Sequence, residues 1–340
     1  MLPAATKSLR PDRRPRADQA PLRALLLILV IGLAGCGPSN SDRDSDRDSN
    51  RDAEPAAKRS SPAPIQPAPP PPAPRATSPS DLLGPLDIPT IAIVVDDWGH
   101  RRDATTRGFA ELDFPLTFSI LPGLRFSRQD ALQATPLALP DDPAWDTAAA
   151  PPPQRRREIM LHLPMEPEGY PEHDPGPDPL RVGMDRGRVA AILDAALAGV
   201  PGARGLNNHM GSAATADPEL MTALADELAA RGLYFLDSLT TPRSVAAARM
   251  RAAGVPTLVN RIFLDQSVTS REQVRELLAQ LVKSARARGA AVGICHPYPE
   301  TLAVLSEELP RLRDEGLRLV TASELLALEA ARRTAAETLP

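Results

Sequence analysis

The 340-residue chain is poor in several residue types, and each shortage excludes a class of protein. Its only two cysteines, Cys36 and Cys295, are too few for a zinc ribbon or a disulfide-stabilised scaffold. The formal net charge is −4 and residues 86–330 hold no extended basic tract, which argues against nucleic acid as a partner because binding it requires clustered cations. Aromatic residues number only 6 Phe, 3 Tyr and 2 Trp, against 39 prolines. We therefore expect part of the chain to lie outside any packed core.

Residues 1–35 have the pattern of a secretory signal peptide. Basic residues precede an apolar run over residues 24–34, which is too short to span a bilayer. The run ends in Leu33-Ala34-Gly35-Cys36, which resembles the lipobox of bacterial lipoproteins, and that resemblance implies a lipidated Cys36 as the first mature residue. We expect a periplasmic protein anchored by lipid to the cell envelope, with the outer membrane favoured because Gly37 and not Asp follows the cysteine. A weak transmembrane anchor with an incidental cysteine is the alternative.

Residues 36–85 are predicted to form a disordered tether. A repeat of Ser, Asp and Arg over residues 41–48 is followed by ten prolines between Pro55 and Pro79, and almost no large apolar side chain is present to offset the entropy of ordering. A charged and proline-rich segment of this kind holds a domain away from a membrane. The following residues 86–330, about 240 in number, are enough for one large core, and residues 331–340 are left as a C-terminal tail.

The predicted domain alternates short apolar runs with amphipathic segments, as β/α chains do. Eight runs predict strands covered on both faces, at residues 90–95, 116–121, 159–163, 205–208, 233–236, 257–260, 292–295 and 317–320. Helices are predicted between them: Asp217 begins one that Gly232 ends, Ser270 begins another that Gly289 ends, and a third is expected from Asp185. These elements predict a distorted (β/α) barrel of seven or eight strands, in which chemistry takes place past the C-terminal ends of the strands.

Polar side chains follow the predicted strands at the point where they end. Those positions hold Asp96, Asp97, His162, Glu166, Asn208, His209, Asp237, Asp265 and His296. Taken singly, each has an ordinary explanation, since paired aspartates often form turns, Asp237 and Asp265 are most often helix caps, and a loop histidine is usually structural. Together they indicate more, because three of the five histidines lie at strand ends. Two histidines and a carboxylate around one rim are the ligands expected for Zn²⁺ or a similar ion, with a second carboxylate to accept a proton and another histidine to donate one.

Five stretches of the chain resemble motifs of the divergent polysaccharide deacetylase family, relatives of metal-dependent carbohydrate esterases with a distorted barrel. They are residues 91–97 (IAIVVDD), 116–122 (LTFSILP), 161–166 (LHLPME), 207–212 (NNHMGS) and 294–297 (ICHP). The resemblance implies one set of roles: Asp96 as general base, Asp97, His162 and His209 as ligands of a divalent metal, expected to be zinc, and His296 as general acid. The implied reaction removes acetyl groups from an envelope polysaccharide or a peptidoglycan-type glycan, and Asn208 and Asp237 are expected to contact that substrate.

The chain departs from the usual pattern of these esterases at one metal position. Usual members have a second histidine four residues after the first, but here that residue is Glu166, so the ligand role of His209 is inferred from geometry. We assign Glu166 to substrate binding, with a metal ligand or a supporting partner of the ligands as alternatives. No counterpart of the family's usual arginine motif is recognisable either. An inactive barrel that binds an envelope glycan or protein is therefore the alternative function.

Two further features complete the predictions. Prolines interrupt residues 128–157 where a helix should precede the third strand, which predicts a flexible insertion near the rim. Cys295 has no disulfide partner if Cys36 is lipidated, so we expect a small buried residue, with a reactive thiol as the alternative. A phosphoesterase is a weaker third function, because no cluster of Arg and Lys accompanies the rim motifs.

Overall fold

A computed structural model of the protein describes residues 87–134, 157–265 and 270–338. The predicted signal peptide, the lipidation site Cys36 and the whole tether lie outside the described residues, as do residues 135–156 of the predicted insertion. Within the described part of the chain, no helix has both the length and the apolarity needed to cross a membrane.

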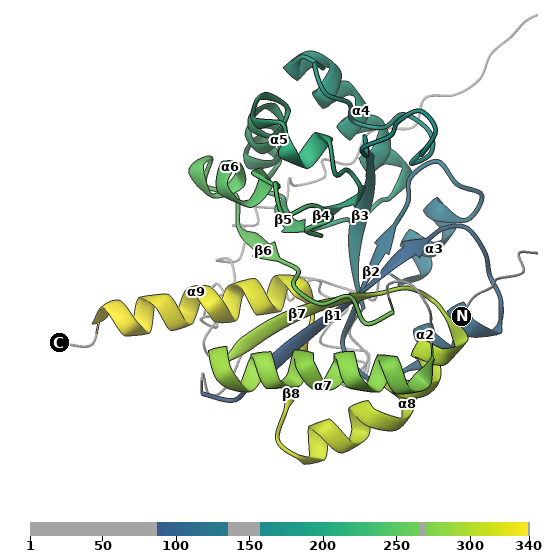
Figure 1. Cartoon of the computed structure of the whole chain (residues 1–340), viewed down its shortest axis with the longest axis vertical. Coiled ribbons are helices and arrows are strands. Elements are labelled where there is room, and N and C mark those ends of the chain that lie inside the picture. Colours follow the sequence, from purple (N-terminus) through teal and green to yellow (C-terminus); the bar gives the residue numbers. More distant parts are fainter. Residues whose placement is uncertain (1–86, 135–156, 266–269, 339–340) are drawn as a thin grey trace, which may run out of the picture. The chain divides into compact units, whose positions relative to one another are not determined.

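Parallel strands form one sheet in the described residues, with helices packed around it (Figure 1). The strands are β1 (Thr90–Trp98), β2 (Leu116–Ile120), β3 (Arg157–Met165), β4 (Gly205–Met210), β5 (Tyr234–Asp237), β6 (Thr257–Val259), β7 (Ala290–Cys295) and β8 (Arg318–Val320). All eight predicted strands are therefore confirmed, with ends that differ by at most three residues. Their order is β6-β5-β4-β3-β2-β1-β7, and β8 pairs with β1.

The sheet curls into a nearly closed barrel. β7 pairs with β1 from Thr90 to Val95, and at the other edge the chain just after β6 reaches β7, where the Leu264 amide donates to the Ile294 carbonyl at 2.8 Å. β8 pairs only with the start of β1, where Arg318 lies opposite Thr90. Seven strands thus make the ring and the eighth is attached beside β1, which confirms the predicted distorted barrel.

Helices follow the strands, and the three that the sequence predicts begin after Asp185, Asp217 and Ser270, as expected. They are α2 (Ala104–Glu111), α3 (Ser127–Ala134), α4 (Arg186–Gly199), the 3₁₀ helix η3 (Ala214–Ala216), α5 (Pro218–Arg231), α6 (Ala246–Ala252), α7 (Arg271–Arg288), α8 (Pro299–Asp314) and α9 (Ala322–Thr338). The Asp217 carboxylate accepts the Leu220 amide at the start of α5, and Gly232 ends that helix at φ 65°, a left-handed conformation suited to glycine. Because α9 continues to Thr338, most of the predicted C-terminal tail is helical.

Alternate residues of each strand pack on opposite faces of the barrel wall. On β1, Ile91 and Ile93 belong to the large apolar cluster that includes the inner faces of the helices, whereas Ala92 and Val94 belong to a smaller cluster inside the barrel. Leu325 of α9 joins this inner cluster, so the first turns of α9 pack into the N-terminal end of the barrel. Cys295 is fully buried in the outer cluster, as predicted.

The inner face of β3 shows how the interior is layered. Glu158, Met160 and His162 are alternate residues of this strand, and all three are buried. Met160 packs in the inner apolar cluster, Glu158 lies toward the N-terminal end of the barrel, and His162 lies toward its C-terminal end. The barrel interior therefore has a polar layer at each end with an apolar layer between them.

Candidate metal centre

Asp96 and Asp97 lie at a β-bulge near the end of β1. The pairing of β1 with β2 shifts register between Val95 and Trp98, and Asp97 has a left-handed φ of 60°. Simple alternation would aim the two side chains at opposite faces, but Asp96 Oδ2 and Asp97 Oδ1 lie 3.5 and 3.4 Å from the same atom, His162 Nε2. The bulge turns the second carboxylate back toward the barrel mouth, as bulges beside active sites often do.

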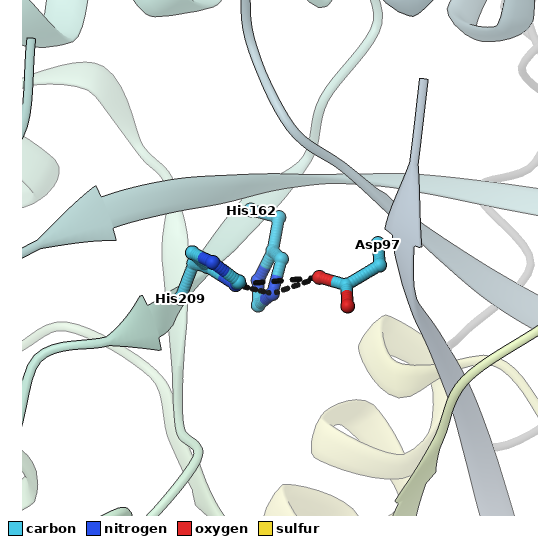
Figure 2. A group of neighbouring side chains, drawn as sticks. All are labelled: Asp97, His162 and His209. Carbon is cyan, nitrogen blue, oxygen red and sulfur yellow. Dashed lines mark hydrogen bonds and ion pairs between the residues drawn. The ribbon is translucent and has the colours of Figure 1, made fainter. Parts of the chain in front are cut away.

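Asp97, His162 and His209 bring three potential ligand atoms together from β1, β3 and β4 (Figure 2). The His209 Nδ1 atom lies 3.0 Å from His162 Nε2 and 3.3 Å from Asp97 Oδ1. Potential ligand atoms of all three residues lie within 4.8 Å of one another. His162 is buried while Asp97 and His209 are partly exposed, so the cluster is accessible from the rim.

The chemistry of these atoms fits a divalent cation. Asp97 Oδ1 is buried, yet no hydrogen-bond donor among the described residues is aligned with it. Two imidazole nitrogens and a carboxylate oxygen are a common ligand set for Zn²⁺ and related ions, and three protein ligands leave further positions for water or substrate. A cation among the three atoms would satisfy the orphaned oxygen and separate the two nitrogens.

The pKa shifts of Asp97 and His162 also indicate that this cluster favours positive charge. Burial raises the pKa of Asp97, but the contacts with His162 and His209 outweigh it and hold the pKa of that carboxyl well below its usual range. Burial lowers the pKa of His162, but Asp96 and Asp97 outweigh it, so the net shift is upward. Protons and a metal ion therefore compete for these atoms.

Asp96 lies beside the three potential ligands without belonging to their set. Its carboxylate is buried and accepts hydrogen bonds from Asn207 Nδ2 at 2.9 and 3.1 Å. Burial raises the pKa of Asp96, and the neighbouring His162 and His296 only partly oppose that effect. A carboxylate with a raised pKa next to a metal site is suited to accept a proton.

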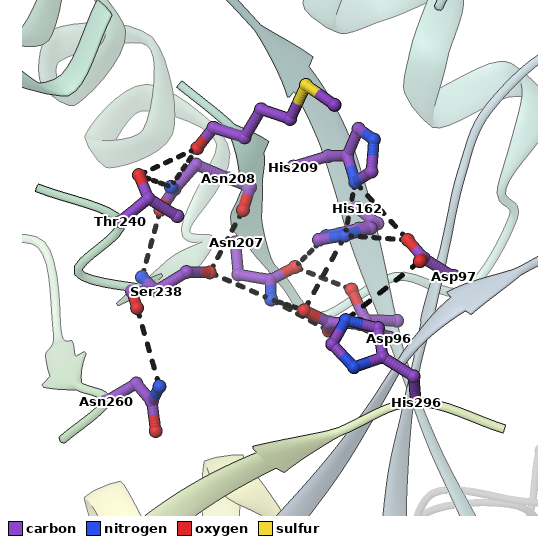
Figure 3. A network of polar contacts seen from close by, with 12 residues as sticks. Asp96, Asp97, His162, Asn207, Asn208, His209, Ser238, Thr240, Asn260 and His296 are labelled. Carbon is purple, nitrogen blue, oxygen red and sulfur yellow. Dashed lines mark hydrogen bonds and ion pairs between the residues drawn. The ribbon is translucent and has the colours of Figure 1, made fainter. Parts of the chain in front are cut away.

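His296 lies across the rim from His209, at the end of β7 (Figure 3). Its Nδ1 atom lies 2.8 Å from Asp265 Oδ1, and its Nε2 atom lies 4.0 Å from Asp97 Oδ2. Burial lowers the pKa of His296, but the hydrogen bond to Asp265 and the charge of Asp96 outweigh it and raise the pKa to about 9. At neutral pH this histidine carries a proton that it can donate.

Asp265 shows where the sequence-based reasoning was wrong. We expected a helix cap, but the cap of α7 is Ser270, and Asp265 instead accepts hydrogen bonds from the His296 amide and the Thr301 hydroxyl, both at 2.8 Å. The carboxylate thereby orients the His296 ring. No local signal predicts this contact, because 31 residues separate Asp265 from His296.

The three residues assigned to substrate binding make hydrogen bonds that hold the rim loops. The Glu166 carboxylate accepts the Val182 amide at 2.9 Å, and the Asp237 carboxylate accepts the Leu239 amide and the Ser244 hydroxyl. These three contacts hold the loops at the rim. A substrate role for Glu166, Asn208 and Asp237 stays a prediction.

Asn207 and Asn208 are both buried on β4 but have different surroundings (Figure 3). Asn208 donates to the Met210 carbonyl at 2.7 Å and accepts the Ser238 amide at 2.9 Å, so it stabilises the loops after β4 and β5. Asn207 instead contacts Asp96 and His162 directly. Asn208 was the residue predicted for the site, whereas Asn207 is the one that contacts Asp96 and His162. The available signal was two adjacent amides in a buried strand.

Comparisons with known proteins agree with the barrel and its motifs. The sequence profile described as divergent polysaccharide deacetylase matches residues 93–326. An uncharacterized protein of Haemophilus influenzae is 35% identical over 230 residues, which cover 68% of this chain and 74% of that protein. The uncharacterized protein YibQ of Escherichia coli is 30% identical over 245 residues, covering 72% of this chain and 70% of YibQ.

A solved structure has the same fold. The crystal structure of the uncharacterized protein ATU2773 from Agrobacterium tumefaciens superposes with a TM-score of 0.61, covers 73% of this chain and 95% of its own, and is 23% identical. The sequence profile runs from within β1 to the start of α9 and includes all three potential metal ligands. The chain belongs to the divergent polysaccharide deacetylase family.

Proposed function

We propose that the protein is a metal-dependent hydrolase that removes acetyl groups from an envelope polysaccharide or a peptidoglycan-type glycan. The observation that carries this proposal is the clustering of Asp97, His162 and His209, flanked by the Asp96 carboxylate and the His296 imidazole. A proton acceptor, a proton donor and a cation site around one rim are the groups that metal-dependent acyl hydrolysis uses. Zinc is the proposed ion, because the ligands are two imidazoles and one carboxylate.

A divalent cation at this cluster would polarise the acetyl carbonyl, stabilise the oxyanion and lower the pKa of the attacking water. The protein's own groups move the protons. Asp96 takes one proton from the attacking water, and its raised pKa favours that transfer. His296 gives a proton from Nε2 to the departing nitrogen or oxygen of the sugar, while Asp265 holds the ring through Nδ1. The products are acetate and the deacetylated glycan.

The surface beside the cluster supports a sugar as substrate. Met210 and Tyr298 are two of the four exposed large apolar side chains in the described residues, with 39% and 38% of their surface accessible. Met210 follows His209 directly, and the Tyr298 ring lies 5.7 Å from the His296 ring between centroids. Apolar and aromatic surfaces on either side of a polar centre can pack on the C–H faces of pyranose rings.

The experiment is to measure zinc content and acetate release on the same purified protein, with acetylated chitooligosaccharides and peptidoglycan as substrates. Asp96→Asn should lower acetate release by about 10²- to 10⁴-fold, as expected for loss of a general base, while zinc stays bound. Asp314→Asn, at an exposed position in the last turn of α8, is the matched control. Wild-type protein that holds zinc but releases no acetate would contradict the proposal and favour a glycan-binding barrel.

A further inference from the structure

Asn207 is a fully buried amide whose polar atoms are all engaged (Figure 3). Its Oδ1 atom accepts the Ser119 hydroxyl at 2.5 Å and lies 2.7 Å from His162 Nδ1. Its Nδ2 atom donates to both oxygens of Asp96 and, at 3.3 Å, to Ser238 Oγ. The amide therefore bridges the potential base and a potential metal ligand.

The orientation of this amide follows from counting donors and acceptors. An ionised Asp96 can only accept, so the NH₂ group and not the carbonyl oxygen of Asn207 must face it. The Ser238 hydroxyl donates to the Asn208 carbonyl at 3.0 Å, which leaves its oxygen to accept the second N–H of Asn207. The opposite orientation would place the amide oxygen against a carboxylate. Asn207 Oδ1 consequently faces Ser119 and His162.

The orientation of Asn207 in turn determines which nitrogen of His162 carries the proton. A carbonyl oxygen cannot donate, so His162 Nδ1 must be the donor in the 2.7 Å contact. In the neutral ring the lone pair then belongs to Nε2. That atom lies 3.4 Å from Asp97 Oδ1 and 3.0 Å from His209 Nδ1, at the centre of the potential ligands.

We propose that Asn207 is a positioning residue that holds His162 in the tautomer able to bind a cation and couples that tautomer to the ionised Asp96. The inference rests on the proposed function in requiring a divalent cation at this cluster and an Asp96 that is ionised, as a general base must be. Partners of metal-binding histidines fix ring orientation and ligand basicity, and losing one commonly lowers metal affinity by about 10- to 100-fold. Asn207 differs from a simple partner because the same amide also holds the base.

The first test reads the tautomer directly in the wild-type protein. Two-bond ¹H–¹⁵N spectra of histidine-labelled protein distinguish Nδ1–H from Nε2–H, and the His162 signal is assigned by its absence in His162→Gln. We expect Nδ1–H both in the zinc-bound protein and in metal-free protein at alkaline pH, where the ring is neutral. An Nε2–H tautomer would overturn the inference. This measurement requires no variant at position 207, so it holds even if such variants fold poorly.

The second test compares two substitutions of Asn207 by zinc titration. Asn207→Ala removes the acceptor and should weaken zinc binding by about 10- to 100-fold. Asn207→Asp keeps an oxygen for His162 Nδ1–H but places a second carboxylate against Asp96, so zinc affinity should stay well above that of the alanine variant while acetate release falls. A purely structural role would lower zinc affinity equally in both variants, and that result would overturn the inference.

Asn260→Ala is the matched control for these variants. Asn260 is a buried asparagine after β6 that donates to the Ser238 carbonyl and contacts none of the potential metal ligands. Its replacement should leave zinc affinity within about twofold of wild type, since none of the residues that orient the ligands is lost. A loss as large as that of Asn207→Ala would attribute the effect to destabilisation and overturn the inference. Because zinc affinity and tautomer are measured without substrate, an absence of acetate release would contradict the proposed function alone.

Discussion

The two polar layers inside the barrel both contain a buried carboxylate, yet they differ in what surrounds it. At the N-terminal end, the Glu158 carboxylate accepts hydrogen bonds from the hydroxyls of Thr117, Tyr234 and Ser323 and from the Ser323 amide. At the C-terminal end, Asp96 lies among imidazole nitrogens and a second carboxylate. Burial raises the pKa of both groups.

At the Glu158 end, each of these partners donates a hydrogen bond and the layer is closed. Ser323 belongs to the first turn of α9, so the contact attaches this helix to the barrel, and a carboxylate at a helix N-terminus is favourably placed. Gly205 allows the Tyr234 ring to pack across β4, because a Cβ at that position would lie 2.5 Å from the ring. Among the described residues, the Glu158 carboxylate is thus paired with protein donors that join the barrel to α9.

At the Asp96 end, carboxylate oxygens and imidazole nitrogens converge, and the donors among the described residues do not satisfy all of them. Asp97 Oδ1, His162 Nε2 and His209 Nδ1 face one another, and Asp97 Oδ1 is orphaned among the described residues. The comparison shows that burial and a raised pKa do not by themselves identify a reactive carboxylate. What distinguishes the two ends is whether the surrounding groups satisfy the charge or leave lone pairs for a cation.

The largest effect should come from removing a potential ligand at the open end. His209→Ala should weaken zinc binding by more than about 100-fold, which is the loss expected when only a hydrogen-bond partner of a ligand is removed. Zinc should also no longer raise the melting temperature of this variant. Zinc titration and thermal unfolding with and without zinc measure both effects. His173→Ala, in the loop after β3, is the matched control. Unchanged zinc affinity in His209→Ala would remove His209 from the ligand set.

Substitution of Glu158 at the closed end should change the free energy of unfolding, and the change should depend on pH. Glu158→Gln places N–H groups against donors and should lower the free energy of unfolding by about 1–3 kcal/mol at low pH. The raised pKa of Glu158 means that its protonated form adds stability below the unfolded pKa, and that this stability is lost as pH rises through the folded pKa. The difference in the free energy of unfolding between wild type and Glu158→Gln should therefore become smaller from pH 4 toward pH 7, as measured by urea unfolding.

Two outcomes would contradict this account of the closed end. If the difference in unfolding free energy between wild type and Glu158→Gln grows with pH, the hydrogen-bond donors keep Glu158 ionised in the folded protein. Glu307 lies on the exposed face of α8. If Glu307→Gln changes the free energy of unfolding with the same pH dependence, that dependence does not arise from the burial of Glu158.

The smallest effect should be a shift in the pH dependence of acetate release. His296 is protonated below its pKa of about 9, so activity should fall as pH rises through that value. Asp265→Asn removes the carboxylate that raises the pKa, and the alkaline limb of kcat/KM should move to lower pH. Asp130→Asn, a buried aspartate paired with Arg102, should leave the limb in place. A limb that does not move in Asp265→Asn would show that His296 is not the proton donor.

Much of the fold was predictable because its signals are local. The apolar runs predicted all eight strands, and the caps at Asp217 and Ser270 began helices where expected. Most of the candidate site was also predictable, since the C-terminal ends of parallel strands meet at one rim. Asp96, Asp97, His162, His209 and His296 do lie together there.

The contacts within the site were decided by the tertiary structure. Asp265 lies 31 residues from His296, and the loop after β6 brings the two into contact. Asn207 lies 111 residues from Asp96 and 45 from His162 in the chain, and the register of β3 and β4 places it beside His162. A shift of one residue in that register would place Asn208 in the position of Asn207. The bulge that redirects Asp97 likewise depends on the pairing of β1 with β2.

The amino-acid sequence by itself determined which residues form strands and helices and which end of the barrel carries the candidate site, because periodicity and capping act over a few residues. Only the tertiary structure decided which carboxylate is paired with donors, which lone pairs converge and which amide orients them. Those properties depend on atoms within about 3 Å of one another, and such distances are set by packing between strands that are far apart in the chain.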